Sequence, residues 1–442
     1  MNGIMLAQKG AIGVNGPAFV QVAEQGVRYH VLPTEKFKTN TVVVNVQLPL
    51  AEETVTPAAL LPFVLKRGSQ TYPTTKALQR RLDELYGASL EVDVAKRGER
   101  QILQFRLEVA NEAYLTDPVP LLTETLAVLR DVLTRPVVED GALASAFVAS
   151  EKERLRKRLE SLLDDKIRYA SQRCTEEMCR EEPYRLFAYG RKEGLAAITP
   201  QSLYDLYQDL FARYPIDVFL VGDVDPDRAQ HALGKLFDGL SRRPKDTLPP
   251  TVIKTAVAER RTVVERLDVT QGKLNIGCRT PVTIADADAY PALLVYNGVL
   301  GGFPHSKLFV NVREKASLAY YAASRLDSHK GILMIFSGIA IENFEKALAI
   351  IEEQLALLRR GEITDDELQR TKASLANQYR ELLDNPRQLI DFAYHSVLAE
   401  RPITVDGLIE GIMGVTKDDV VRIAEGVVVD TVYFLRDRGN ES

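Results

Sequence analysis

Apolar and polar positions alternate along two runs in the first quarter of the chain, residues 41–48 and 101–107. A period of two is typical of a β-strand with one buried face. A third run, residues 331–336, is almost continuously apolar and also favours a strand. Long charged segments follow these runs in both parts of the chain, and we expect them to form helices.

One combination of patterns occurs twice. A threonine that can cap a helix, Thr199 or Thr416, precedes a helical segment, and each helical segment leads to an apolar strand, residues 216–221 or residues 430–435. Threonine accepts hydrogen bonds from the first free N–H groups of a helix, so both positions predict a helix start. The two parts of the chain therefore end in the same pattern, which indicates an internal repeat.

A second combination lies upstream of the first. An acidic step at residues 137–140 or 363–366 is expected to open a long charged helix. That helix is expected to close in a Leu-Leu-Asp sequence, within residues 161–165 or 381–385. Two repeats in the same order predict two homologous halves.

The two halves are separated by a segment unsuited to regular structure. Residues 241–250 hold three prolines and four charged residues, which disfavours both helix and central strand. We therefore expect an N-terminal half at 1–240, a linker at 241–250 and a C-terminal half at 251–442. Because strands and helices occur in blocks, each half is expected to be an α+β fold, a mostly antiparallel sheet packed with helices.

Composition and charge exclude several classes of protein. The net charge is −5, with 45% hydrophobic and 26% charged residues, which indicates a globular chain and no affinity for nucleic acid. Three cysteines form no metal or disulfide motif. No apolar run approaches the ~20 residues that cross a bilayer. We expect a cytoplasmic protein that does not insert into membranes.

The most specific motif is at residues 301–321, Gly-Gly-Phe-Pro-His-Ser-Lys-Leu-Phe-Val-Asn-Val-Arg-Glu-Lys-Ala-Ser-Leu-Ala-Tyr-Tyr. It resembles the second-half motif of the insulinase/pitrilysin-type peptidases, the inverted zincins that include mitochondrial processing peptidase. The resemblance implies two tandem homologous α+β halves that together form half of a clamshell.

In that family the first half carries zinc on a His-x-x-Glu-His helix. When residues 66–69 are matched to the family's Phe-Lys-Gly-Thr, the motif positions fall on residues 59–63, Ala-Leu-Leu-Pro-Phe. Ala59, Pro62 and Phe63 offer no metal ligand, and none of the five histidines in the chain is spaced for a helical pair. The family's third ligand falls loosely on Glu160, which by itself would be a solvated carboxylate on a charged helix. We expect no zinc in this chain.

The same resemblance assigns roles to Arg313 and Tyr320. In the family an arginine and a tyrosine of the second half reach the zinc site, where they bind the substrate backbone and stabilise the oxyanion. Here Arg313 is expected on a helix that opens near Ser306, and Tyr320 on the following strand. The alternative is an exposed helical arginine and a half-buried tyrosine bonded to backbone.

Four further residues of the motif are candidates for substrate binding: Gly301, Gly302, His305 and Lys307. The glycine pair permits a bend or a close backbone approach, and His305 beside it could contact the substrate backbone. Lys307 stands where the family often has arginine. The alternative for His305 and Lys307 is a surface position at a helix start.

Three functional hypotheses follow. The first is the zinc-free subunit of a two-chain peptidase, which binds peptide and supplies Arg313 and Tyr320 to a zinc-bearing partner of similar size. The partner could be such a homologue, in a heterodimer, or a second copy of this chain. The second is a non-catalytic scaffold or peptide-binding protein that kept the fold. The third is an enzyme of other chemistry, for which no motif is present.

Overall fold

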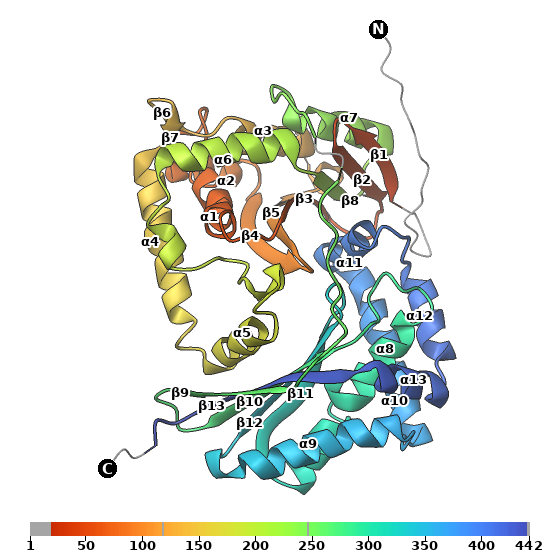
Figure 1. Ribbon diagram of the computed structural model, residues 1–442. Helices are drawn as coiled ribbons and strands as arrows, with labels where there is room; N and C mark the ends of the chain where they lie inside the picture. Colours follow the sequence, from red (N-terminus) through yellow and green to blue (C-terminus); the bar gives the residue numbers. More distant parts are fainter. Residues whose placement is uncertain (1–18, 117–118, 245–246, 440–442) are drawn as a thin grey trace.

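Two β-sheets, each packed against helices, form the two halves of the molecule (Figure 1). The computed structural model describes residues 19–116, 119–244 and 247–439. In the first half the strands are β1 Val20–Glu24, β2 Val27–Pro33, β3 Thr39–Pro49, β4 Ser89–Arg97, β5 Arg100–Ala110, β6 Val138–Glu139, β7 Ala142–Leu143 and β8 Ile216–Gly222. The α-helices there are α1 Val55–Leu65, α2 Thr75–Glu84, α3 Leu121–Thr134, α4 Ser145–Ser161, α5 Lys166–Met178, α6 Pro200–Arg213 and α7 Pro226–Gly234.

The second half contains a similar set of elements. Its strands are β9 Arg261–Arg266, β10 Gly272–Arg279, β11 Ala319–Asp327, β12 Ile332–Ile339 and β13 Val428–Arg436. Its α-helices are α8 Tyr290–Asn297, α9 Phe344–Arg359, α10 Asp365–Glu381, α11 Pro386–Leu398, α12 Val405–Gly414 and α13 Lys417–Gly426. Two π-helices, η5 Gly298–Gly302 and η6 Phe309–Lys315, lie between α8 and β11.

The two sheets have the same strand order. After the edge strand β1, the first sheet runs β2-β8-β3-β5-β4, and the second runs β9-β13-β10-β12-β11. In each sheet one pair is parallel, β2 with β8 and β9 with β13, and the other pairs are antiparallel. The predicted α+β class and the mostly antiparallel sheets are confirmed.

The repeated helices also follow the sequence pattern. Thr199 and Thr416 cap α6 and α13, and both form capping boxes. Asp165 and Asn385, which end the two Leu-Leu-Asp turns, cap α5 and α11 through their side chains. One expected start was wrong: residues 137–140 do not open α4, because Asp140 and the following glycine have positive φ and turn the chain into the β6–β7 hairpin.

The central strand β3 shows how the first sheet is covered. Val42, Val44 and Val46 belong to the main core of the first half, whereas Val43 belongs to a separate apolar cluster on the opposite face. That cluster contains Ile390 and Ala393 of α11, a helix from the second half. Both faces of the first sheet are therefore buried, one by its own helices and one by a helix of the other half.

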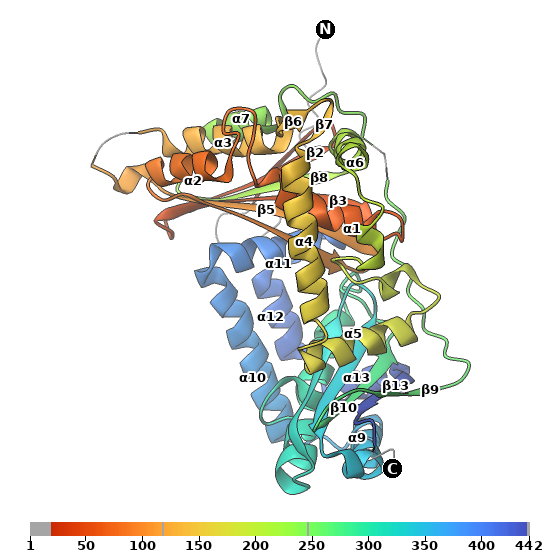
Figure 2. The same ribbon diagram turned by 90° about the vertical axis from the view of Figure 1, so that its left-hand side faces the viewer.

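The reverse contact covers the second sheet. Cys174 and Met178 of α5, a helix from the first half, pack with Met334, Tyr433 and Leu435 of the second sheet. Figure 1 shows α11 below the first sheet and α5 above the second, and Figure 2 shows α4 running from the first half toward α5. Each half thus contributes one helix to the other. Two apolar clusters therefore combine residues from both sides of the linker.

A buried group of charged residues joins the halves beside α5. Arg279, whose side chain is 1% exposed, donates from Nη2 to Glu182 Oε1 at 2.6 Å and from Nε to Asp430 Oδ2 at 2.9 Å. Lys330, with no exposed side-chain surface, lies 2.7 Å from carboxylate oxygens of Glu99 and of Glu182. Buried charges are tolerated only when they are paired in this way, so these contacts fix the geometry of the junction.

A histidine pair lies at the same junction. His329 Nε2 and His395 Nδ1 share a hydrogen bond of 2.7 Å. Burial first, and then nearby positive charge that includes Arg97, lower the pKa of His329 to about 4 and that of His395 to about 3. Both rings are therefore neutral at pH 7.

Two further expectations concern the linker between the halves and the absence of membrane-spanning helices. Residues 240–244 and 247–260 form neither helix nor strand. The predicted linker 241–250 lies in this segment, apart from residues 245 and 246, which are outside the described residues; its boundaries stay a prediction. Within the described ranges, the helices are all too short or too polar to traverse a bilayer.

The buried charges give a stability prediction. Replacing Arg279→Met leaves Glu182 and Asp430 without their shared partner, and breaking a buried pair from one side costs roughly 3–5 kcal/mol. Arg370→Met on α10 is a matched control, because the pair Arg370–Asp366 is exposed and worth less than about 1 kcal/mol. Urea unfolding followed by circular dichroism compares the two. Equal midpoints for both variants would show that the junction does not depend on Arg279.

The histidine pair gives a prediction about pH. The unfolded chain binds protons near pH 6.5 and the folded chain does not, so stability falls as pH drops from 6.5 toward 4. The loss is at most about 1.4 kcal/mol per pH unit for each histidine. His395→Gln should flatten the dependence measured by urea unfolding at pH 7.5 and pH 5, whereas the exposed His231→Gln should not. An unchanged slope in His395→Gln contradicts the assignment.

Candidate functional site

The helix at the predicted metal-motif positions, α1, is apolar on all sides. Ala59, Leu60, Leu61 and Pro62 are buried, and Phe63 packs against the core of the first half. A helix with no polar face is stable only when it is surrounded by other elements. None of these side chains has an atom that can ligate zinc or activate water, so the residues present do not fit the metal.

The third candidate ligand, Glu160, does not lie toward α1. The face of α4 with buried side chains carries Glu151 and Leu155, and Arg158 continues it at helical spacing. The Arg158 guanidinium lies 5.1 Å from the Phe63 ring centroid and 4.7 Å from that of Tyr189. A cation therefore occupies the helix face where a ligand would be needed.

Glu160 itself is engaged in surface ion pairs. Its carboxylate lies 2.6 Å from Lys192 Nζ and 2.6 Å from Arg156 Nη1, and these cations lower its pKa. The solvated-carboxylate interpretation describes it well. In the part of the chain that the structure describes, no group of three or more His, Cys, Asp or Glu side chains is arranged to hold a metal ion.

The second-half motif lies on η5, η6 and the start of β11. Gly301 is buried, and a Cβ added there would lie 2.5 Å from the backbone nitrogen of Ser324 on β11. Only glycine permits this approach. Gly302 is exposed and has no such contact below 3.3 Å. The glycine pair was expected to allow a close backbone approach or a bend. At Gly301 the backbone that approaches closely is that of β11 in the same chain.

His305 and Lys307 contact α10. His305 Nε2 lies 3.2 Å from Thr371 Oγ1, and its ring stacks on Phe303. Lys307, whose side chain is 8% exposed, donates to Glu367 Oε1 at 2.9 Å. Both side chains therefore anchor the motif segment to α10, and their role toward a substrate stays a prediction.

Arg313 lies on η6, so the expected helix is present but is a π-helix. Its side chain is exposed, and the guanidinium lies 4.5 Å from the Phe309 ring centroid. Asn311 anchors the same helix by donating from Nδ2 to Gln354 Oε1 at 2.6 Å. Within the described residues Arg313 has no acidic partner. π-Helices are rare and often mark functional sites.

Tyr320 lies at a β-bulge on the edge strand β11. The pairing of β11 with β12 shifts register between Ala319 and Tyr321. Tyr320 is 72% exposed, whereas Tyr321 packs tightly over Gly338. A bulge redirects a side chain, and here it leaves Tyr320 facing solvent. The alternative interpretation expected a half-buried tyrosine bonded to backbone. It was wrong about burial, because the Tyr320 side chain is largely exposed.

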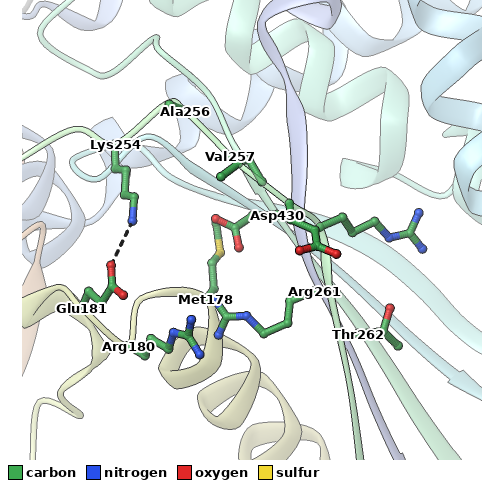
Figure 3. A pocket seen from close by; sticks show the side chains of 12 residues that line it. Met178, Arg180, Glu181, Lys254, Ala256, Val257, Arg261, Thr262 and Asp430 are labelled. Carbon is green, nitrogen blue, oxygen red and sulfur yellow. Dashed lines mark ion pairs between the residues drawn. The ribbon is translucent and has the colours of Figure 1, made fainter.

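Two cavities lie beside α5. One, of about 440 Å³, lies between α5 and β11 and is lined by Ile167, Tyr321 and Arg325. A larger one, of about 740 Å³, lies between the end of α5 and residues 254–262 (Figure 3). In its wall Lys254 Nζ lies 3.7 Å from Glu181 Oε2. None of the predicted site residues lines it.

Comparison with known proteins agrees with this geometry. Residues 197–375 match the family description "Peptidase M16 inactive domain". The "Probable inactive metalloprotease YmfF" of Bacillus subtilis is 43% identical over 415 residues, which is 93% of this chain and 96% of that protein. The chain belongs to the M16 peptidase family. Because its motif positions lack zinc ligands, it is a peptidase-like M16 protein of the inactive type.

Two solved structures extend the comparison. A conserved protein from Enterococcus faecalis is 33% identical, with a TM-score of 0.86, over 94% of this chain and 98% of that one. A protease from Helicobacter pylori is 17% identical, with a TM-score of 0.78, over 95% of this chain and 99% of that one. At that identity the second comparison shows the fold alone. The M16 fold, half of a clamshell, is confirmed for this chain.

The composition of α1 predicts that the purified chain binds no stoichiometric zinc and cleaves no peptide by itself. Alanine, proline and phenylalanine side chains give a metal nothing to bind. Elemental analysis of the protein, together with hydrolysis of a mixed peptide library, measures both. One tightly held zinc per chain, whose removal abolishes a hydrolytic activity, would overturn the assignment.

Proposed function

We propose that this chain is the zinc-free subunit of a two-chain M16 peptidase. In this proposal it pairs with a homologue of similar size that carries His-x-x-Glu-His, binds the peptide, and lends Arg313 and Tyr320 to the partner's zinc site. One contrast carries the proposal. The motif positions of α1 are filled with buried apolar side chains, whereas Arg313 and Tyr320 are exposed.

The chemistry of the two side chains suits these roles. A guanidinium has five N–H donors in a planar fork, which can bind peptide carbonyl groups. A tyrosine hydroxyl can donate to the oxyanion of a tetrahedral intermediate. The π-helix and the bulge hold both side chains away from their own core, where another molecule can reach them.

The neighbouring surface supports peptide binding. The cavity of about 440 Å³ beside β11 combines the aromatic ring of Tyr321 with the polar groups of Ser171 and Gln172 on α5. A mostly open cavity of that size accommodates part of a peptide. Arg325 on β11 also lines it and adds a donor for carbonyl groups.

A second candidate is a scaffold or peptide-binding protein without a role in hydrolysis. It is favoured by His305 and Lys307, whose packing against α10 leaves them little freedom to contact a substrate. In that case Arg313 and Tyr320 would be surface residues of a retained fold.

Variants of the two exposed residues distinguish the candidates. In the assembled pair, Tyr320→Phe should lower turnover about 10²–10³-fold, because it removes one oxyanion donor. Arg313→Ala should lower kcat/KM through weaker peptide binding. Tyr114→Phe is the matched control, since Tyr114 is 49% exposed in the first half. Peptide hydrolysis and gel filtration are measured for each pair.

The expected result is an intact pair with strongly reduced hydrolysis for the two site variants. Neither substitution removes a core side chain, so folding and association should be retained. Wild-type rates in both variants would exclude the proposed role and favour the scaffold.

A further inference from the structure

A small cavity lies where the end of β4 meets α11, away from Arg313 and Tyr320. Its volume is about 330 Å³, and residues of both halves line it. Most of the lining is apolar or aromatic, including Tyr290, Tyr379, Leu382 and Phe392. Ligand sites typically combine such walls with a few polar groups, and this volume is at the lower end of their range.

The cavity contains one cation without an acidic partner. Arg97, the last residue of β4, is partly buried and donates from Nη1 to the adjacent Lys96 carbonyl oxygen at 3.2 Å. None of the ion pairs between described residues includes it. A partly buried guanidinium retains donors for a ligand anion in this situation.

The cavity also contains one anion. Asp391 of α11 is partly buried, and its carboxylate takes part in no hydrogen bond or ion pair within the described ranges. Burial raises its pKa, although Arg106 and Arg97 counteract this. Arg97 and Asp391 therefore interact electrostatically, but they are too far apart to form an ion pair with each other.

A separated cation and anion at the wall of an apolar cavity complement a small zwitterion. We propose that this cavity binds a free α-amino acid with a large apolar side chain. Its carboxylate binds Arg97, its ammonium group binds Asp391, and its side chain packs among Tyr290, Tyr379 and Phe392. A simple anion would be repelled by Asp391, and a simple cation by Arg97. The interior of a peptide carries neither charge.

This proposal stands apart from the proposed peptidase role, since the two sites share no residue. It is tested on the purified full chain by titration calorimetry with three probes. They are L-phenylalanine, 3-phenylpropionate, which lacks the amino group, and 2-phenylethylamine, which lacks the carboxylate. L-Phenylalanine should bind at least about 10-fold more tightly than either analogue, because each analogue leaves one charge of the cavity without a partner.

Two variants assign the charges. Arg97→Met should abolish the preference for L-phenylalanine over 2-phenylethylamine, and Asp391→Asn should abolish the preference over 3-phenylpropionate. Arg228→Met, on the exposed face of α7 in another cavity, is the control and should keep both preferences.

Three results would each overturn the proposal. The first is an affinity of the wild-type chain for L-phenylalanine weaker than about 10 mM. The second is equal affinity for the three probes. The third is unchanged selectivity in both cavity variants. Circular dichroism of each variant confirms that it is folded, and the comparison of probes on the wild-type chain tests the proposal even where a variant is not.

Discussion

The arrangement of the whole molecule depends on the exchange of α5 and α11 between the halves. Each sheet has an apolar face that its own half leaves open, and a helix of the other half covers it. Separating the halves would expose both faces to water, at a cost of about 25 cal/mol for each Å² of apolar surface. Arg279 and Lys330 lie at the same junction with their carboxylate partners. The halves therefore fold as one unit, although each has a complete sheet.

A second set of contacts, within the second half, holds the segment that carries its exposed groups. Gly301 brings η5 against β11, and Lys307 binds Glu367 at the start of α10. From this anchored segment, η6 and the bulge of β11 present Arg313 and Tyr320 to solvent. The first half has no corresponding functional side chain on α1 that must be kept exposed. A helix that holds no metal can be apolar throughout, and α1 has become part of the core.

The sequence was sufficient where the signal is local. Alternating residues predicted β3 and β5, and Thr199 and Thr416 predicted two helix starts, because strand period and capping depend on neighbours in the chain. The exchange of α5 and α11 could not be predicted, since an amphipathic pattern does not say which sheet a helix covers. The π-helix and the bulge depend on tertiary packing, and so does the presence of Arg97 and Asp391 in the wall of one cavity. Counting helical positions from Glu151 would have placed Arg158, not Glu160, toward α1.

The central claim is that this chain completes the site of a zinc-bearing partner. The direct test is to mix the purified chain with the His-x-x-Glu-His homologue of similar size from the same genome. Light scattering after gel filtration gives the mass of the assembly, and a peptide library gives its activity. The account predicts a stable complex with one copy of each chain and hydrolysis that neither chain shows alone. Separate species with no gain in hydrolysis would contradict it.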